Sequence, residues 1–139
     1  MGVTSYSHFS KKETKMTITE AIARIDSLKP NRFSEIEKIR WLSELDGKIK
    51  IEVIDTHEGG DKVSFVPYDE NTKANTTSLL IPAPHDNIYI LWLETKIDYY
   101  NAEYQRYNNS SIAFNTAYMD FLRSYNKEHM PKAHKLKFF

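Results

Sequence analysis

The stretch that decides the fold runs from Pro82 to Met130 and reads PAPHDNIYILWLETKIDYYNAEYQRYNNSSIAFNTAYMDFLRSYNKEHM. Its apolar and aromatic residues recur at alternating spacings of three and four, which places them on one side of an α-helix. These residues are Ile90, Leu93, Ile97, Tyr100, Tyr104 and Tyr107. The spacing predicts one helix of about five turns. We expect it to end at Asn108-Asn109-Ser110, before a second helix that returns antiparallel and carries Phe114, Tyr118, Phe121 and Tyr125.

A second set of apolar residues on the first of these helices points in nearly the opposite direction. The ordinary interpretation of such a helix is that it lies in the core. The other interpretation is that a neighbouring subunit covers one side. The candidate subunit-interface residues are Trp92, Tyr99 and Ile88 of this helix, with Ala102 in the same row, and Trp41 at the edge of an earlier apolar face.

The first half of the chain predicts two more helices. Thr17 with Glu20 forms a capping box before a stripe that ends at Lys29-Pro30, and Ser34 with Glu37 forms a second one. The second helix is expected to reach about His57, with a bend or break at Asp46-Gly47 as an alternative, because glycine disfavours a helix interior.

Residues 58–83 differ from the helical segments in their pattern, because two short apolar runs flank a polar middle. They predict a long excursion, either irregular or a two-stranded hairpin. We therefore expect three parts, namely a flexible arm at 1–15, a single helical domain at 16–131 and an extended C-terminal tail at 132–139. The fold class is mainly α, a small bundle built from helix hairpins.

The composition excludes several functions. Lysine plus arginine equal aspartate plus glutamate at 19 each, so no overall field attracts nucleic acid or an acidic membrane. There is no cysteine, and no apolar run approaches the roughly 18 residues of a membrane span. The sequence therefore indicates a soluble intracellular or virion protein.

We find no catalytic or metal signature in the sequence. Asp55, His57, Glu58 and Asp61 lack the spacing of a zinc site, and a polar helix end is the simplest account of them. Glu94 and Asp98 lie one turn apart, an arrangement more typical of a solvated helix face than of a catalytic pair. We expect no enzyme activity, no metal and no cofactor.

Several segments together resemble structural proteins of tailed phages and prophages of Firmicutes, a group associated with head–tail connectors, also called head-completion or adaptor proteins. The resemblance covers residues 16–132. It is carried by TITEAI at 17–22, EKIRWLSELDGKI at 37–49, LIPAPHDNIYILWLE at 80–94, IDYYNAEYQRYNNS at 97–110 and YNKEHMPK at 125–132.

The resemblance implies a ring, commonly of twelve copies, between the portal protein and the next neck or tail-completion protein. Packaged DNA would pass through its lumen without sequence-specific contact. The protein would be in the virion neck, and in the host cytoplasm during assembly, with no membrane contact. The expected portal-docking residues are those of the basic, aromatic tail, namely Lys132, Lys135, Leu136, Lys137, Phe138 and Phe139. The alternative is a monomeric phage-encoded binding module, either an assembly chaperone or a nucleic-acid-associated regulator.

Overall fold

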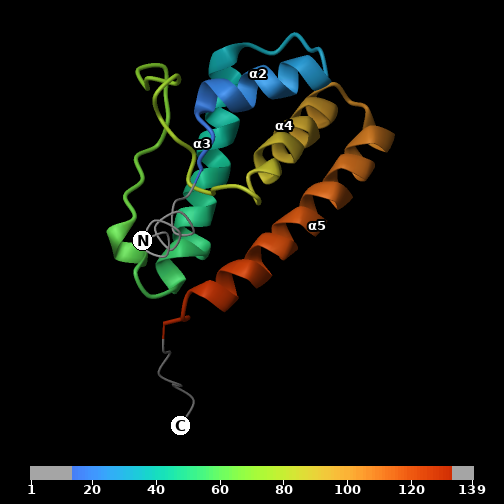
Figure 1. Cartoon of the computed structure of the whole chain (residues 1–139). Helices are drawn as coiled ribbons and strands as arrows, with labels where there is room; N and C mark the ends of the chain where they lie inside the picture. Colours follow the sequence, from blue (N-terminus) through green and yellow to red (C-terminus); the bar gives the residue numbers. More distant parts are fainter. Residues whose placement is uncertain (1–13, 133–139) are drawn as a thin grey trace, which may run out of the picture.

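The computed structural model describes residues 14–132, and this part of the chain is a small, mainly helical bundle, as the sequence predicted. The elements are α2 (Ile18–Leu28), α3 (Glu35–Glu52), the short 3-10 helices η1 (Ile54–Thr56) and η2 (Gly60–Lys62), α4 (Asn87–Tyr100) and α5 (Tyr104–Glu128). In Figure 1, α4 lies between α3 and α5, while α2 crosses the top of the bundle.

Both predicted capping residues begin their helices. The Thr17 hydroxyl accepts a hydrogen bond from the Glu20 amide (3.1 Å), and the Glu20 carboxylate accepts one from the Thr17 amide (2.8 Å). The Ser34 hydroxyl accepts from the Glu37 amide in the same way (3.2 Å). These side chains satisfy amides that have no partner within the helix.

The end of α3 differs from the prediction. The helix passes through Gly47 without a break and ends at Glu52 rather than near His57. A methyl group added at Gly47 would lie 3.6 Å from the ring of Phe65, so the glycine faces a packed side chain from the excursion. Packing and the bonds made by Asp46 keep this part of α3 helical despite the low helix propensity of glycine.

The predicted single long helix is wrong, because the chain turns at 101–103 and not at 108–110. Ala102 has φ of 58°, and the amides of Asn101 and Glu103 donate to the carbonyls of Ile97 (2.9 Å) and Asp98 (3.0 Å). Such a left-handed residue after the last turn closes a helix. Tyr104 and Tyr107 therefore belong to α5, and Asn108 lies within it. The antiparallel hairpin itself is present.

The excursion at 58–83 forms no strand, so the hairpin alternative is wrong. It follows the side of α3 away from α5 (Figure 1), and hydrogen bonds to the beginning of α2 hold it. The carbonyls of Thr77 and Ala74 accept from the amides of Ile18 (3.1 Å) and Thr19 (3.0 Å). The excursion thereby satisfies free donors at the start of α2.

The core is centred on α4, which packs against α2, α3 and α5. Its inward residues are fully buried, and the buried side chains of α2, α3 and the excursion surround them. The core interpretation of this helix is confirmed. The buried α4 residues are Ile88, Tyr89, Ile90, Leu93, Thr95, Ile97 and Asp98.

Candidate docking site

The C-terminal end of the described chain is held at a defined place. The Lys132 amide donates to the Thr56 carbonyl (2.9 Å), and the Glu58 amide donates to the Met130 carbonyl (2.8 Å). His57 and Pro131 form the antiparallel bridge between these two hydrogen bonds. The chain after Lys132 therefore starts from a fixed point beside η1.

His57 joins the end of α3 to the end of α5. Its ring is buried, with Nδ1 2.6 Å from the Val53 carbonyl oxygen and Nε2 2.6 Å from the side-chain oxygen of Asn126. Tyr125 packs edge-on against His57 and stacks on His129 at a centroid distance of 3.9 Å. These aromatic rings pack next to residues 130–132, which we call the exit of the chain.

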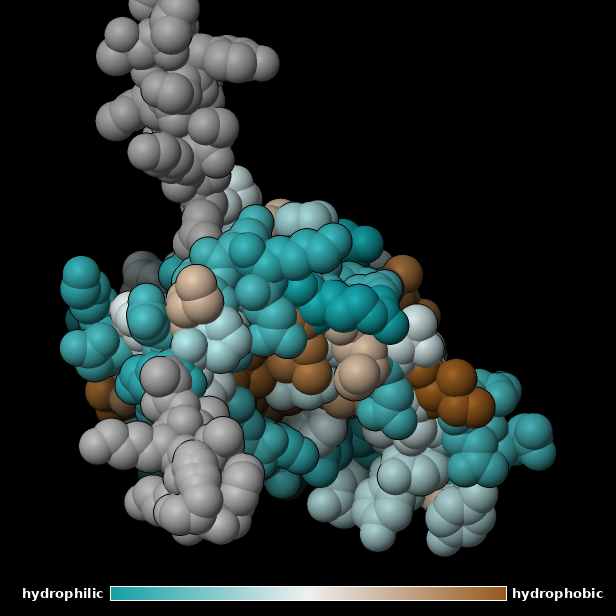
Figure 2. Space-filling model, turned by 90° about the horizontal axis from the view of Figure 1, so that it is seen from below, coloured by the Kyte–Doolittle hydropathy of each residue, from teal (hydrophilic) through white to brown (hydrophobic). Residues whose placement is uncertain are grey.

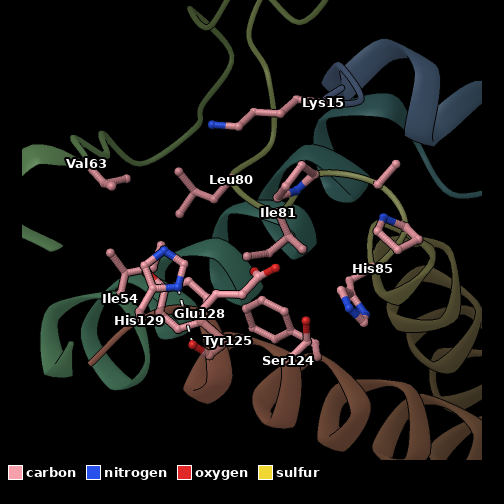
Figure 3. Close-up of a pocket in the computed structure, with 14 residues that line it drawn as sticks. Lys15, Ile54, Val63, Leu80, Ile81, His85, Ser124, Tyr125, Glu128 and His129 are labelled. Carbon is pink, nitrogen blue, oxygen red and sulfur yellow. Dashed lines mark hydrogen bonds between the residues drawn. The ribbon is translucent and has the colours of Figure 1, made fainter. Parts of the chain in front are cut away.

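A pocket of about 440 Å³ lies beside this exit, between segment 80–85 and the last turns of α5. Figure 3 shows Leu80, Ile81 and His85 on one side and Ser124, Tyr125 and Glu128 of α5 on the other. The remaining lining residues are Lys15, Ile54, Val63, Pro82, Ala83, Pro84, Phe121 and His129. Seen from below, the molecule shows apolar surface in a hollow among hydrophilic side chains (Figure 2).

This lining suits an apolar ligand with some charge. Most of the lining residues are aliphatic or aromatic, but about half of the exposed surface of the pocket is polar, and Lys15 and Glu128 add one charge of each sign. No hydrogen bond described for the pocket joins Ser124 to His85 or His129, so the described residues there show no nucleophile paired with a base. The concave shape and the mixed lining of the pocket make it a candidate binding site.

The structure corrects two of the four predicted subunit-interface residues. Ile88 is 0% exposed and Trp41 is 4% exposed, so both are core residues of a single chain. The sequence pattern indicates an interface at these positions because it does not show that α2, α3 and α5 together cover both sides of α4.

The other two predicted interface residues differ from each other. Trp92 is partly buried against Phe114, and its Nε1 donates to the Trp41 carbonyl (2.7 Å). Tyr99 is 50% exposed, and its ring contacts those of Tyr100 and Tyr107. Tyr99 is thus the one member of the predicted set with a large free surface.

The outward side of α5 also carries exposed apolar residues. Only Ser110 and Phe121 are buried among its 25 residues. Ile112 is 65% exposed and Met119 is 50% exposed. They are seven residues apart and so lie on the same side of the helix.

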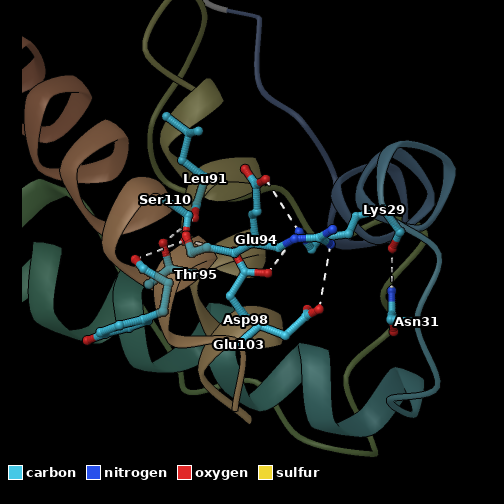
Figure 4. A network of polar contacts seen from close by, with 10 residues as sticks. Lys29, Asn31, Leu91, Glu94, Thr95, Asp98, Glu103 and Ser110 are labelled. Carbon is cyan, nitrogen blue, oxygen red and sulfur yellow. Dashed lines mark hydrogen bonds and ion pairs between the residues drawn. The ribbon is translucent and has the colours of Figure 1, made fainter. Parts of the chain in front are cut away.

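Asp98, predicted to lie on a solvated face, is buried instead. Its carboxylate is 2.8 Å from the Lys29 Nζ and accepts a hydrogen bond from the Ser110 hydroxyl (2.9 Å), while Glu94 lies 3.8 Å from the same lysine (Figure 4). This network joins α2, α4 and α5. The prediction was wrong because the partners come from helices that are distant in sequence.

A second buried network was missed by the sequence reasoning. The Asp46 carboxylate accepts hydrogen bonds from the hydroxyls of Tyr89 and Tyr68, each at 2.6 Å, and from the Leu80 amide at 3.1 Å. The Tyr89 hydroxyl also accepts one from the Ile81 amide (2.8 Å). These bonds fasten the end of the excursion to α3 and α4.

Burial raises the pKa of Asp46 above its ordinary value, although the three hydrogen bonds act in the opposite direction. Burial and the neighbouring carboxylate raise the pKa of Tyr68 and of Tyr89 as well. The hydrogen bonds of this network join α3, α4 and the excursion.

Of the predicted portal-docking residues, Lys132 is exposed at the anchored exit. Lys135, Leu136, Lys137, Phe138 and Phe139 lie outside the described residues, as does most of the arm at 1–15. Asp55, His57, Glu58 and Asp61 do not form a metal site: no group of three or more potential ligands is placed to bind a metal within residues 14–132.

Comparisons with protein-family models, with curated proteins and with solved structures found no match to this chain. Among residues 14–132, no helix combines the length and the hydrophobicity that crossing a membrane requires.

Proposed function

We propose that this chain is a head–tail connector subunit of a tailed phage. In this proposal, twelve copies of it form a ring on the portal. The ring extends the DNA channel and offers a docking surface to the next neck protein. The role is geometric and needs no catalytic group. The sequence segments described above support it, together with the small helical bundle that such a subunit is expected to have.

The observation that carries the proposal is the outward side of α5. The core of the single chain is closed around α4, yet this long helix leaves Ile112 and Met119 exposed, with Tyr99 beside its start. A contiguous exposed apolar patch on a monomer commonly marks a protein interface, and Ile112 and Met119 would form part of such a patch in a ring. A ring repeats one heterologous interface around a closed circle, and an exposed helix side can supply half of that interface.

The anchored exit supports portal docking by the tail. Because hydrogen bonds fix residues 130–132 against 56–58, every subunit of a ring would present its tail at the same place. Phe138 and Phe139 would supply affinity, while the lysines would set orientation and association rate.

The test compares phage particles made with the full chain and with a chain ending at Lys132. Quantitative mass spectrometry of purified virions should find the full chain in multiple copies per portal ring. The shortened chain should keep its helical circular dichroism but not attach to heads, which should fill with DNA and fail to join tails. Absence of the full chain from mature virions would refute the proposal.

The pocket favours a second candidate, a monomeric binding module. A concave site of about 440 Å³ with both apolar and polar walls is of the size that binds small ligands or peptide side chains. This candidate predicts that the protein stays monomeric when mixed with portal rings and is missing from virions. Size-exclusion chromatography of that mixture separates the two functions.

A further inference from the structure

We propose that the pocket between segment 80–85 and the end of α5 is a peptide-binding site, and that residues 133–139 of the same chain are its ligand. The chemical class of ligand is a short basic peptide with large apolar side chains. Three observations lead to this assignment: the position of the exit, the reach of the segment, and the match between its residues and the walls of the pocket.

The exit and the pocket share a wall. Ile54 lines the pocket two residues before Thr56, whose carbonyl accepts from the Lys132 amide. His129, which also lines the pocket, precedes Lys132 by three residues. The segment therefore starts at the edge of the site.

The reach of the segment is sufficient. Phe138 lies six positions after Lys132, and an extended chain spans at most about 3.3–3.6 Å per position, or about 20 Å in all. Since the exit adjoins the wall, Leu136 and Phe138 can both come within the site even when part of this length is used for a turn.

The residues of the segment match the site in pattern and in charge. In an extended chain successive side chains point to opposite sides, so Leu136 and Phe138 share one side while Lys135 and Lys137 share the other. The first pair fits the walls made by Leu80, Ile81 and Phe121. The lysines then remain near the solvent, where the exposed carboxylate of Glu128 can meet one of them.

The segment of the same chain has an advantage over the same segment of another copy. A short tether gives an effective concentration in the millimolar range, which exceeds the concentration of other copies in ordinary solutions. The pocket is therefore filled within the chain first. Residues 1–13 are the other segment that starts nearby, since the Thr14 carbonyl accepts from the Ala83 amide (2.9 Å).

The consequence for assembly rests on the proposed function. A tail bound in its own pocket keeps Phe138 covered in the free subunit, and the portal must compete for it. Premature association through the tail would then be suppressed until a ring of portal sites is present.

The experiment uses full-length chains without portal, so its result does not depend on the connector proposal. The probe is a fluorescein-labelled peptide with the sequence of residues 131–139, titrated by fluorescence anisotropy. The triple variant Leu136→Ala, Phe138→Ala, Phe139→Ala should bind the peptide, because its own tail no longer fills the pocket. The wild-type chain should bind it at least tenfold more weakly.

Two further variants locate the binding site. Adding Glu128→Lys to the triple variant should weaken peptide binding severalfold. Adding Asp120→Lys should leave it unchanged, since Asp120 is an exposed acidic residue of the same helix that does not line the pocket. Circular dichroism and thermal melting check that each chain is folded.

Three results would overturn the proposal. A triple variant that fails to bind the peptide at millimolar concentration would show that the pocket does not take this segment, the outcome expected if residues 1–13 fill it. Equal binding by wild type and triple variant would show that the tail of the chain does not occupy the site. If the monomeric wild-type chain binds the peptide as strongly as the triple variant does, and binds it weakly only at concentrations where the chain self-associates, the pocket takes the tail of a second copy.

Discussion

The side of the bundle beneath the excursion buries a polar group, whereas the outward side of α5 exposes apolar ones. Beneath the excursion, the carboxylate of Asp46 is buried, and three donors from Tyr68, Leu80 and Tyr89 satisfy it. On α5, Ile112 and Met119 lie exposed, with apolar surface that residues 14–132 leave uncovered. The first side is a buried polar network of the fold, and the second is exposed apolar surface. Substitutions on the two sides should therefore change different measurements.

The largest effect is expected from Asp46→Ala. It would leave two tyrosine hydroxyls and one amide without their acceptor in the core, and losing one partner of a buried network commonly costs about 3 kcal/mol or more. Urea unfolding followed by circular dichroism measures the loss. Asp61→Ala, at an exposed position, is the control and should change the free energy of unfolding by less than about 0.5 kcal/mol. A loss below about 1 kcal/mol for Asp46→Ala would contradict the central role of this carboxylate.

Removing one hydroxyl should cost less, and the two tyrosines should differ. Tyr89→Phe also deprives the Ile81 amide of its acceptor, so we expect a loss of about 2 kcal/mol. Tyr68→Phe removes only a donor, and about 1 kcal/mol is expected because the Leu80 amide still serves the same carboxylate oxygen. The same urea titrations test the order, and a larger loss for Tyr68→Phe would be inconsistent with the geometry.

A smaller effect concerns pH. Burial raises the pKa of Asp46 in the folded state above its unfolded value, so the folded chain binds more protons between the two. The contribution of this group to stability is therefore present in full below the unfolded pKa and is lost as the pH rises through the folded pKa. Asp46→Asn removes this dependence. The stability difference between wild type and Asp46→Asn should be greater at pH 4 than at pH 7, and the opposite sign would show that the hydrogen bonds outweigh burial.

The smallest effect on stability is expected on α5. Ile112→Ser with Met119→Ser should change the free energy of unfolding by less than about 0.5 kcal/mol per site, since both side chains are largely exposed. Under the connector proposal, the same pair should reduce incorporation into virions. Native mass spectrometry of portal complexes measures this, with Asn108→Ser, an exposed position on the same helix, as the control. Normal incorporation of the double variant would remove this side of α5 from the interface.

The starts of the first two helices could be predicted because they depend on local pairs such as Thr17 with Glu20. The turn after α4 could not. Asn108 and Asn109 are typical of a helix end, but on the exposed side of α5 they are tolerated at little cost, whereas the actual turn uses an alanine where glycine would be the usual signal.

The site was predicted less well than the fold. Asp46 stands among Leu42, Leu45 and Ile49 on the apolar side of α3, a signal for a buried carboxylate that the neighbouring Gly47 obscured. The pocket has no comparable local signal. It exists because segment 80–85, η1 and the end of α5 meet in space, and their separation along the chain hides this from any periodicity.

The left-handed turn at Ala102 has a consequence for the topology of this chain. An L-residue with a side chain is disfavoured at φ of 58°, so the contacts between α4 and α5 hold the turn closed against this local preference. If residues 101–103 straightened, α4 and α5 would become one rod of about 63 Å, from 42 residues at roughly 1.5 Å each. The α5 part of that rod would lose its contact with the α4 of its own chain, and it would have to pack against the α4 of another chain instead. This turn is thus the hinge at which exchange of α5 between two chains would occur, and glycine at position 102 would favour the closed, unexchanged form.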